Sequence, residues 1–68
     1  MFYINGEKIT DNITEKLTTL HDACQYFSDD SEAVATALNG LFVPKSLRQT
    51  TLLSDGDQIE IIAPIEGG

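Results

Sequence analysis

The chain has 68 residues, enough for one small domain that buries only about 60% of the surface its unfolded chain exposes. Eleven acidic residues against four basic ones give a formal net charge of −7, which argues against binding to nucleic acid or to anionic membranes. No apolar run is long enough to span a membrane, and the single cysteine, Cys24, excludes an intramolecular disulfide and favours a reducing, cytoplasmic location.

The first 13 residues predict a β-hairpin. Residues 2–5 form a short run of β-forming side chains that ends in Asn5-Gly6. This dipeptide suits a two-residue type I′ turn, because both central positions of that turn need a positive φ. Residues 7–13 are then expected to form the returning strand.

The next segment has the spacing of a helix. Thr19 with Asp22 three positions later resembles a capping box in which Asp replaces the usual Glu. The polar stretch 28–31 is expected to end the helix. The apolar side chains are separated by three, four and three positions, so they fall on one helical stripe: Leu17, Leu20, Cys24 and Phe27.

Residues 33–43 predict a second hairpin. The small side chains of 33–39 suggest a central strand close beneath the helix, although its alanines also allow a helix on propensity alone. Asn39-Gly40 is the turn, and the strand that leaves it ends at Pro44 or lies at a sheet edge, because proline cannot donate to a ladder. A single turn of helix is expected at 46–50.

The last strand has the most regular alternation in the chain. It follows an expected tight turn at 54–57, and residues 58–63 form a strand whose polar and apolar side chains alternate from Gln58 to Ile61. Gln58 and Glu60 are expected to face solvent. The apolar positions are expected to face the core: Ile59, Ile61 and Ala63. This order of elements predicts an α+β fold in which one main helix packs on one face of a sheet of four to five strands. Residues 1–63 would form the domain and residues 64–68 a flexible tail.

The body of the chain offers few groups for catalysis. His21 and Cys24 lie three apart on the predicted helix, the arrangement of a thiolate with a neighbouring base. Cys24 nevertheless lies on the apolar stripe, so we expect it in the core and His21 on the helix surface. The acidic positions 29, 30 and 32 lack the spacing of a calcium loop. The sequence therefore predicts no metal site and a chain that is not an enzyme.

The last five residues offer a different chemistry: Pro64, Ile65, Glu66, Gly67 and Gly68. A terminal carboxylate is ionised at neutral pH and becomes open to attack only after a partner enzyme adenylates it. The two glycines carry no Cβ and suit a narrow channel, while Pro64 fixes φ at the base of the tail. At about 3.3 Å per residue, five residues reach roughly 16 Å into a partner. The alternative is an inert terminus.

Three stretches resemble the thiamine-biosynthesis sulfur carriers of the ThiS family, in the ThiS/MoaD ubiquitin-like superfamily. They are residues 4–7 (INGE), residues 34–46 (VATALNGLFVPKS), and residues 53–61 (LSDGDQIEI) leading to Gly67-Gly68. Lys45 stands where arginine is more usual, and Leu47 falls near a common tryptophan. The resemblance implies a β-grasp fold with a mixed sheet and a protruding C-terminal tail.

The resemblance also implies a carrier cycle. An E1-like adenylyltransferase of the ThiF type would use ATP and magnesium to adenylate Gly68, and a cysteine desulfurase or rhodanese would supply sulfur for a thiocarboxylate. A thiazole synthase of the ThiG type would receive that sulfur, while the carrier binds no cofactor itself. The other tail residues would serve recognition: Pro64, Ile65, Glu66 and Gly67. Two alternatives remain, a carrier like the molybdopterin synthase small subunit and a ubiquitin-like protein modifier.

Overall fold

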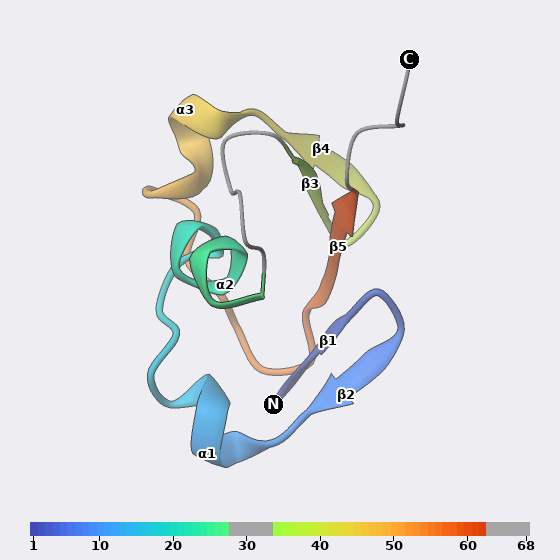
Figure 1. Cartoon of the computed structure of the whole chain (residues 1–68), viewed down its shortest axis with the longest axis vertical. Coiled ribbons are helices and arrows are strands. Elements are labelled where there is room, and N and C mark those ends of the chain that lie inside the picture. The colour runs from blue at the N-terminus through green and yellow to red at the C-terminus, as the bar shows by residue number, and fades with distance from the viewer. Residues whose placement is uncertain (28–33, 63–68) are drawn as a thin grey trace.

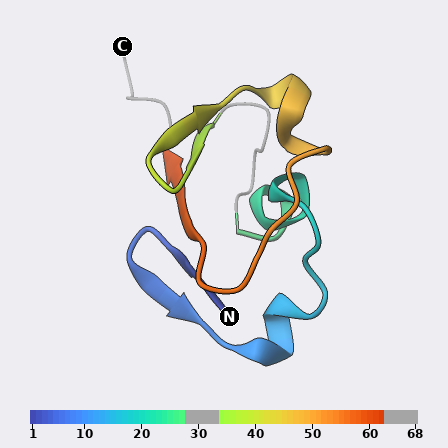
Figure 2. The same cartoon turned by 180° about the vertical axis from the view of Figure 1, so that it is seen from behind.

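The computed structural model describes residues 1–27 and 34–62, which form a five-stranded sheet with three helices on one side of it (Figures 1 and 2). The strand order is β2-β1-β5-β3-β4. Of the described pairs, β1 with β5 is parallel and the others are antiparallel, so the predicted mixed α+β sheet is confirmed. The strands are β1 (Phe2–Ile4), β2 (Glu7–Ile9), β3 (Ala35–Leu38), β4 (Leu41–Val43) and β5 (Gln58–Ile62). The helices are α1 (Asp11–Thr14), α2 (Leu20–Phe27) and α3 (Lys45–Arg48).

Both predicted Asn-Gly turns are present. Asn5 and Asn39 each have a φ of 52°, and the glycines that follow, Gly6 and Gly40, each have a φ of 85°. A type I′ turn needs positive φ at both positions, and asparagine and glycine adopt it at the lowest steric cost. β4 lies at the edge of the sheet and ends directly before Pro44, as the missing N–H of proline requires.

The prediction of a returning strand over residues 7–13 is wrong beyond Ile9. β2 ends there, and α1 begins at Asp11, with the N–H groups of Ile13 and Thr14 donating to the Thr10 carbonyl at 3.1 and 3.2 Å. Ile9 and Ile13 are four positions apart, a spacing that places both on one face of a helix as well as of a strand. The apolar pattern therefore did not distinguish the two.

The helix predicted from the apolar stripe is α2, and it begins at its predicted cap. The Asp22 N–H donates to Thr19 Oγ1 at 3.2 Å, and Asp22 Oδ2 accepts the N–H groups of Thr18 at 3.1 Å and Thr19 at 3.2 Å. These donors, Thr18 first, lower the pKa of the Asp22 carboxyl below its ordinary value. The stabilisation they give is complete above the unfolded pKa and is lost as the pH falls through the lowered folded value.

The core lies between α2 and the sheet. Leu20, Ala23 and Cys24 of α2 are fully buried, and Ile59 of β5 is 1% exposed. Leu17 is also buried in the core, although it precedes the helix. β3 is an interior strand between β5 and β4, as its small side chains suggested, and β5 is the middle strand of the five.

Candidate functional site

The five predicted tail residues, with Ala63 and the acidic stretch at 28–33, lie outside the described part of the chain. The geometry that bears on the tail is therefore that of β5, which leads to it. Figure 1 shows β5 running through the middle of the sheet and ending at the opposite end of the molecule from the N-terminus. Ile59 and Ile61 face the core side, while Gln58 and Glu60 are exposed, as predicted.

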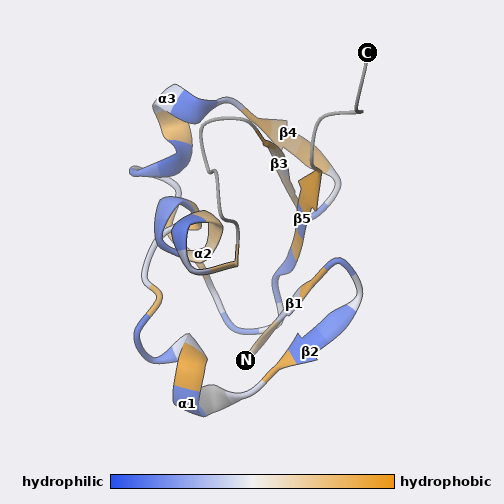
Figure 3. Cartoon of the chain, viewed as in Figure 1, coloured by the Kyte–Doolittle hydropathy of each residue, from blue (hydrophilic) through white to orange (hydrophobic). Residues whose placement is uncertain are grey.

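An apolar surface lies on the helix-free face of the sheet beside the end of β5. In register, Phe42 pairs with Ala37 and Ala35 pairs with Ile62. These side chains point away from the helices, because those that alternate with them, Val43 and Thr36, are buried. We call this set, Ala35, Ala37, Phe42 and Ile62, the outer patch. Figure 3 shows the apolar colouring of β4 and of the end of β5.

The outer patch is exposed where its side chains are largest. Phe42 is 69% exposed and Ile62 is 54% exposed. Leu41, on the opposite face at the sheet edge, is 73% exposed. Glu60 pairs in register with Ala37 and adds a negative charge to the patch. Large exposed apolar side chains grouped in this way are typical of a protein contact surface.

The possible thiol site is ruled out by burial. Cys24 is completely buried, as predicted from the apolar stripe, so a substrate in solution does not reach its sulfur. His21 is only partly buried on α2, in agreement with its predicted place on the helix surface. The two residues are neighbours in sequence spacing, but the arrangement is not that of an accessible nucleophile with its base.

Arg48 is the residue that the sequence did not single out. It is 4% exposed, and its Nε donates to Thr36 Oγ1 at 3.0 Å, while Nη2 donates to the Val34 carbonyl at 2.6 Å. Nη1 lies 3.7 Å from Cys24 Sγ. The guanidinium group therefore joins α3 to β3 and α2 in the interior, a structural role and not an exposed site.

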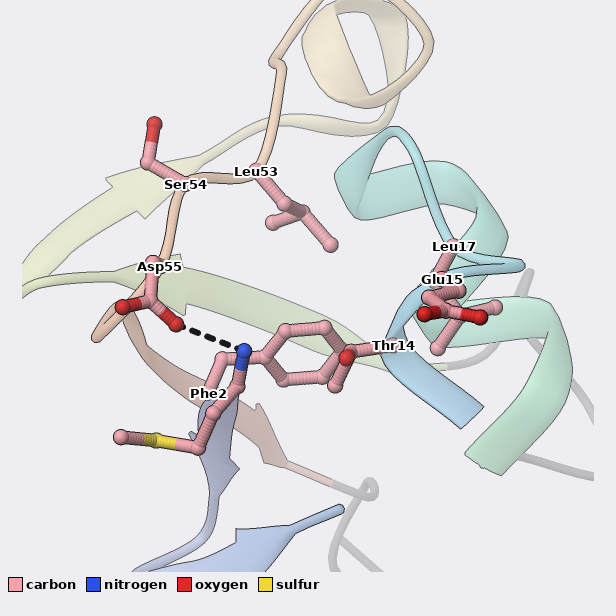
Figure 4. Close-up of a pocket in the computed structure, with 8 residues that line it drawn as sticks. Phe2, Thr14, Glu15, Leu17, Leu53, Ser54 and Asp55 are labelled. Carbon is pink, nitrogen blue, oxygen red and sulfur yellow. Dashed lines mark hydrogen bonds and ion pairs between the residues drawn. The ribbon is translucent and has the colours of Figure 1, made fainter. Parts of the chain in front are cut away.

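A pocket of about 300 Å³ lies at the end of the molecule near the N-terminus, away from the end of β5 (Figure 4). Phe2, Leu17 and Leu53 line it together with polar groups, and the N-terminal ammonium donates to Asp55 Oδ1 at 2.7 Å at its rim. Its described lining contains neither histidine nor cysteine. The pocket therefore offers an ion pair and hydroxyl groups but no activated nucleophile.

Two further classes of site find no support in residues 1–27 and 34–62. These residues contain no group of three or more His, Cys, Asp or Glu side chains placed to hold a metal ion. No helix in this part of the chain is long and apolar enough to cross a membrane.

Comparison with known proteins gives a consistent result. The uncharacterized protein ycf40 of Pyropia yezoensis and that of Porphyra purpurea are each 35% identical to this chain over 65 residues, covering 96% of it and 87% of their own length. The protein of the same name from Trieres chinensis is 30% identical over 67 residues, covering 98% and 88%.

Among solved structures, the crystal structure of the thiamine biosynthesis protein (ThiS) from Geobacter metallireducens superposes with a TM-score of 0.75. The match covers 98% of this chain and 97% of that one at 21% identity, which confirms the β-grasp fold predicted from the sequence. A model of the ThiS family matches residues 4–68. This match spans nearly the whole sequence, so the chain belongs to the ThiS family.

Proposed function

We propose that this protein is a sulfur carrier for thiamine biosynthesis and that its reactive group is the carboxylate of Gly68. The observation that carries the proposal is the family match, which runs from residue 4 through Gly68 and includes the tail as well as the domain. The similarity to a thiamine biosynthesis protein of the same fold supports the pathway. The buried thiol and the N-terminal pocket offer no competing site of sulfur chemistry.

The proposed chemistry has two steps on one carboxyl group. A carboxylate oxygen of Gly68 attacks the α-phosphorus of ATP in the active site of an adenylyltransferase, and pyrophosphate leaves. Hydrosulfide then attacks the carbonyl carbon of the acyl-adenylate, the bond to the phosphate oxygen breaks, AMP leaves, and a thiocarboxylate remains. ATP and magnesium belong to the activating enzyme. In the cell a desulfurase or rhodanese supplies the sulfur as a persulfide, whose attack gives an acyl disulfide, and a second thiol then breaks the S–S bond to release the thiocarboxylate. The carrier then delivers its sulfur to a thiazole synthase.

The outer patch is the docking surface that we propose for the activating enzyme. The patch lies beside the end of β5, and residues 63–68 follow Ile62 directly in the sequence, so a partner that covers Phe42 and Ile62 binds where the tail begins. The net charge of −7 favours a partner with a basic rim around an apolar centre. A single cysteine, which is buried, supports a reducing compartment such as the cytoplasm.

The test is an intact-mass measurement of the chain after incubation with a ThiF-type adenylyltransferase, ATP, magnesium and sulfide. We expect a mass gain equal to the difference between one sulfur and one oxygen atom, placed on Gly68 by fragmentation. The Cys24→Ala chain is the control, and it should gain the same mass because its reacting group is unchanged. A native chain that stays unmodified, or a gain lost in a folded Cys24→Ala chain, would contradict the proposal.

The alternatives give different outcomes in related mixtures. A ubiquitin-like modifier would form protein-sized adducts through lysine side chains when ATP and a cell extract are present. A carrier of the molybdopterin type would acquire the same thiocarboxylate but pass its sulfur to a molybdopterin precursor and not to a thiazole synthase. Transfer from the loaded chain to each acceptor therefore separates the two carriers.

Phe42→Asp is expected to weaken docking on the adenylyltransferase. Phe42 is the largest side chain of the outer patch, and burying a carboxylate in its place costs about 2 kcal/mol, or roughly 30-fold in Kd. The effect should appear in the KM for the carrier, measured by ATP–pyrophosphate exchange. Leu52→Asp is the matched control, because Leu52 is 67% exposed but lies outside the patch. Equal losses in both variants would place the docking surface elsewhere.

A further inference from the structure

The end of β5 extends beyond the strand that flanks it on one side. The last residue pair between β1 and β5 is Ile4 with Ile59, because the chain turns at Asn5-Gly6 into β2. On its other side β5 keeps β3 as a neighbour up to the pair of Ala35 with Ile62. From residue 60 onward, β3 is therefore the only strand in the described part of the chain whose main chain pairs with β5.

The side chain of Asn5 takes the place of the missing strand. Its main-chain N–H donates to the Ile59 carbonyl at 2.8 Å, continuing the β1 ladder. Its Oδ1 then accepts the Ile61 N–H at 2.9 Å, and its Nδ2 donates to the Ile61 carbonyl at 3.2 Å. An amide side chain carries both a donor and an acceptor, so it pairs with both main-chain groups of one residue as a neighbouring strand does.

Asn39 forms a related arrangement at the other end of the same strand. Its main-chain N–H donates to the Gln58 carbonyl at 2.7 Å, and its Oδ1 accepts the Gln58 N–H at 2.9 Å. Its Nδ2 donates to Asp57 Oδ1 at 3.1 Å. The two asparagines share a φ of 52° and the same kind of turn. One holds the beginning of β5 and the other holds its end.

We propose that Asn5 is a positioning residue for the carboxyl-terminal tail. By fixing both main-chain groups of Ile61, it sets the direction in which the chain continues beyond Ile62 toward Gly68. This inference rests on the proposed carrier function, in which Gly68 must enter a partner's active site while the sheet face is docked. A loosened end of β5 spreads the tail over more directions, which lowers the effective concentration of the carboxylate at the reacting atoms.

The test compares Asn5→Gly with Asn39→Gly. Glycine keeps the positive φ of each turn without strain, so each variant removes only a side chain and its hydrogen bonds to β5. Amide exchange of Ile61 should become about tenfold faster in Asn5→Gly and stay native in Asn39→Gly, while Gln58 should show the reverse. The kcat for adenylation, followed by ATP–pyrophosphate exchange, should fall roughly tenfold in Asn5→Gly alone. The KM for the carrier should stay near native, because the outer patch is intact.

The outcomes separate this inference from the function on which it rests. If Asn5→Gly is adenylated with the native kcat, or if both variants lose kcat equally after correction for the folded fraction, Asn5 has no positioning role. Unchanged amide exchange of Ile61 in Asn5→Gly would show that the Asn5 side chain does not hold the end of β5. If the native chain is not adenylated at all while Ile61 exchange responds as expected, the Asn5 side chain still holds the end of β5, and it is the carrier function that fails.

Discussion

The Gly67→Val chain is expected to lose adenylation almost completely, by at least about 100-fold in kcat/KM, while its fold stays native. The carboxylate of Gly68 has to reach an ATP-binding site inside another protein, and a residue without Cβ lets the channel walls approach the backbone. A β-branched side chain at position 67 displaces the reacting carbon. ATP–pyrophosphate exchange measures the loss. Circular dichroism and the Tm should be unchanged, because the described core extends no further along the chain than Ile61.

Gly67→Ala supplies the graded control, since it adds a single methyl group and should lose less activity than Gly67→Val. Native adenylation of the valine variant would show that the channel is not narrow at this position. Deleting Gly67 and Gly68 tests the more basic point, because a chain without them has no glycine carboxylate to load. If the shortened chain still supports thiamine synthesis in cells, the tail is inert and the carrier mechanism is wrong.

Local signals predicted those parts of the fold that depend on local chemistry. The two Asn-Gly turns need positive φ, the Thr19–Asp22 cap pairs side chains with neighbouring N–H groups, and the alternation around Ile59 follows from burial on one face. Prediction failed where spacing was ambiguous. Ile13 lies four positions after Ile9, which fits one face of a strand or of a helix, and hydrogen bonds to Thr10 decide for the helix.

The features that the sequence could not predict depend on contacts between residues far apart in the chain. Asn5 is visible as a turn residue, but its side-chain bonds to Ile61 cross 56 positions of sequence and depend on the parallel pairing of β1 with β5. The exposure of Phe42 likewise depends on which face the helices cover. The reactive tail was predicted from its residue types and from the family resemblance, and it stays a prediction because those residues lie outside the described part of the chain.

The most misleading local pattern lies in α3, where the sequence places an apolar Leu47 beside a charged Arg48. A leucine is ordinarily buried and an arginine exposed, but here Leu47 is 52% exposed and Arg48 is 4% exposed. The reversal has a clear reason in hydrogen bonding. The Val34 carbonyl and the Thr36 hydroxyl both lie in the interior at β3, and the fork of the guanidinium group reaches them together.

Arg48→Ala is therefore expected to be the most destabilising single change, with a loss of about 3 kcal/mol in the free energy of unfolding. The cost combines the cavity left by the long side chain with a buried carbonyl at Val34 that loses its donor. Domains of this size have a total stability near the lower end of roughly 5–15 kcal/mol, so the variant should be partly unfolded at physiological temperature. Urea unfolding followed by circular dichroism measures the change.

Two further variants separate the contribution of the guanidinium hydrogen bonds to stability from the contributions of the charge and the volume of Arg48. Lys45→Met removes the same charge from an exposed position of α3 and should change the stability by less than about 0.5 kcal/mol. Arg48→Met keeps most of the bulk but offers no donor, so it should recover the packing part of the loss and not the part due to Val34 and Thr36. Full recovery in Arg48→Met would mean that packing alone explains the burial of Arg48, and that its hydrogen bonds only offset the cost of removing the charge from water.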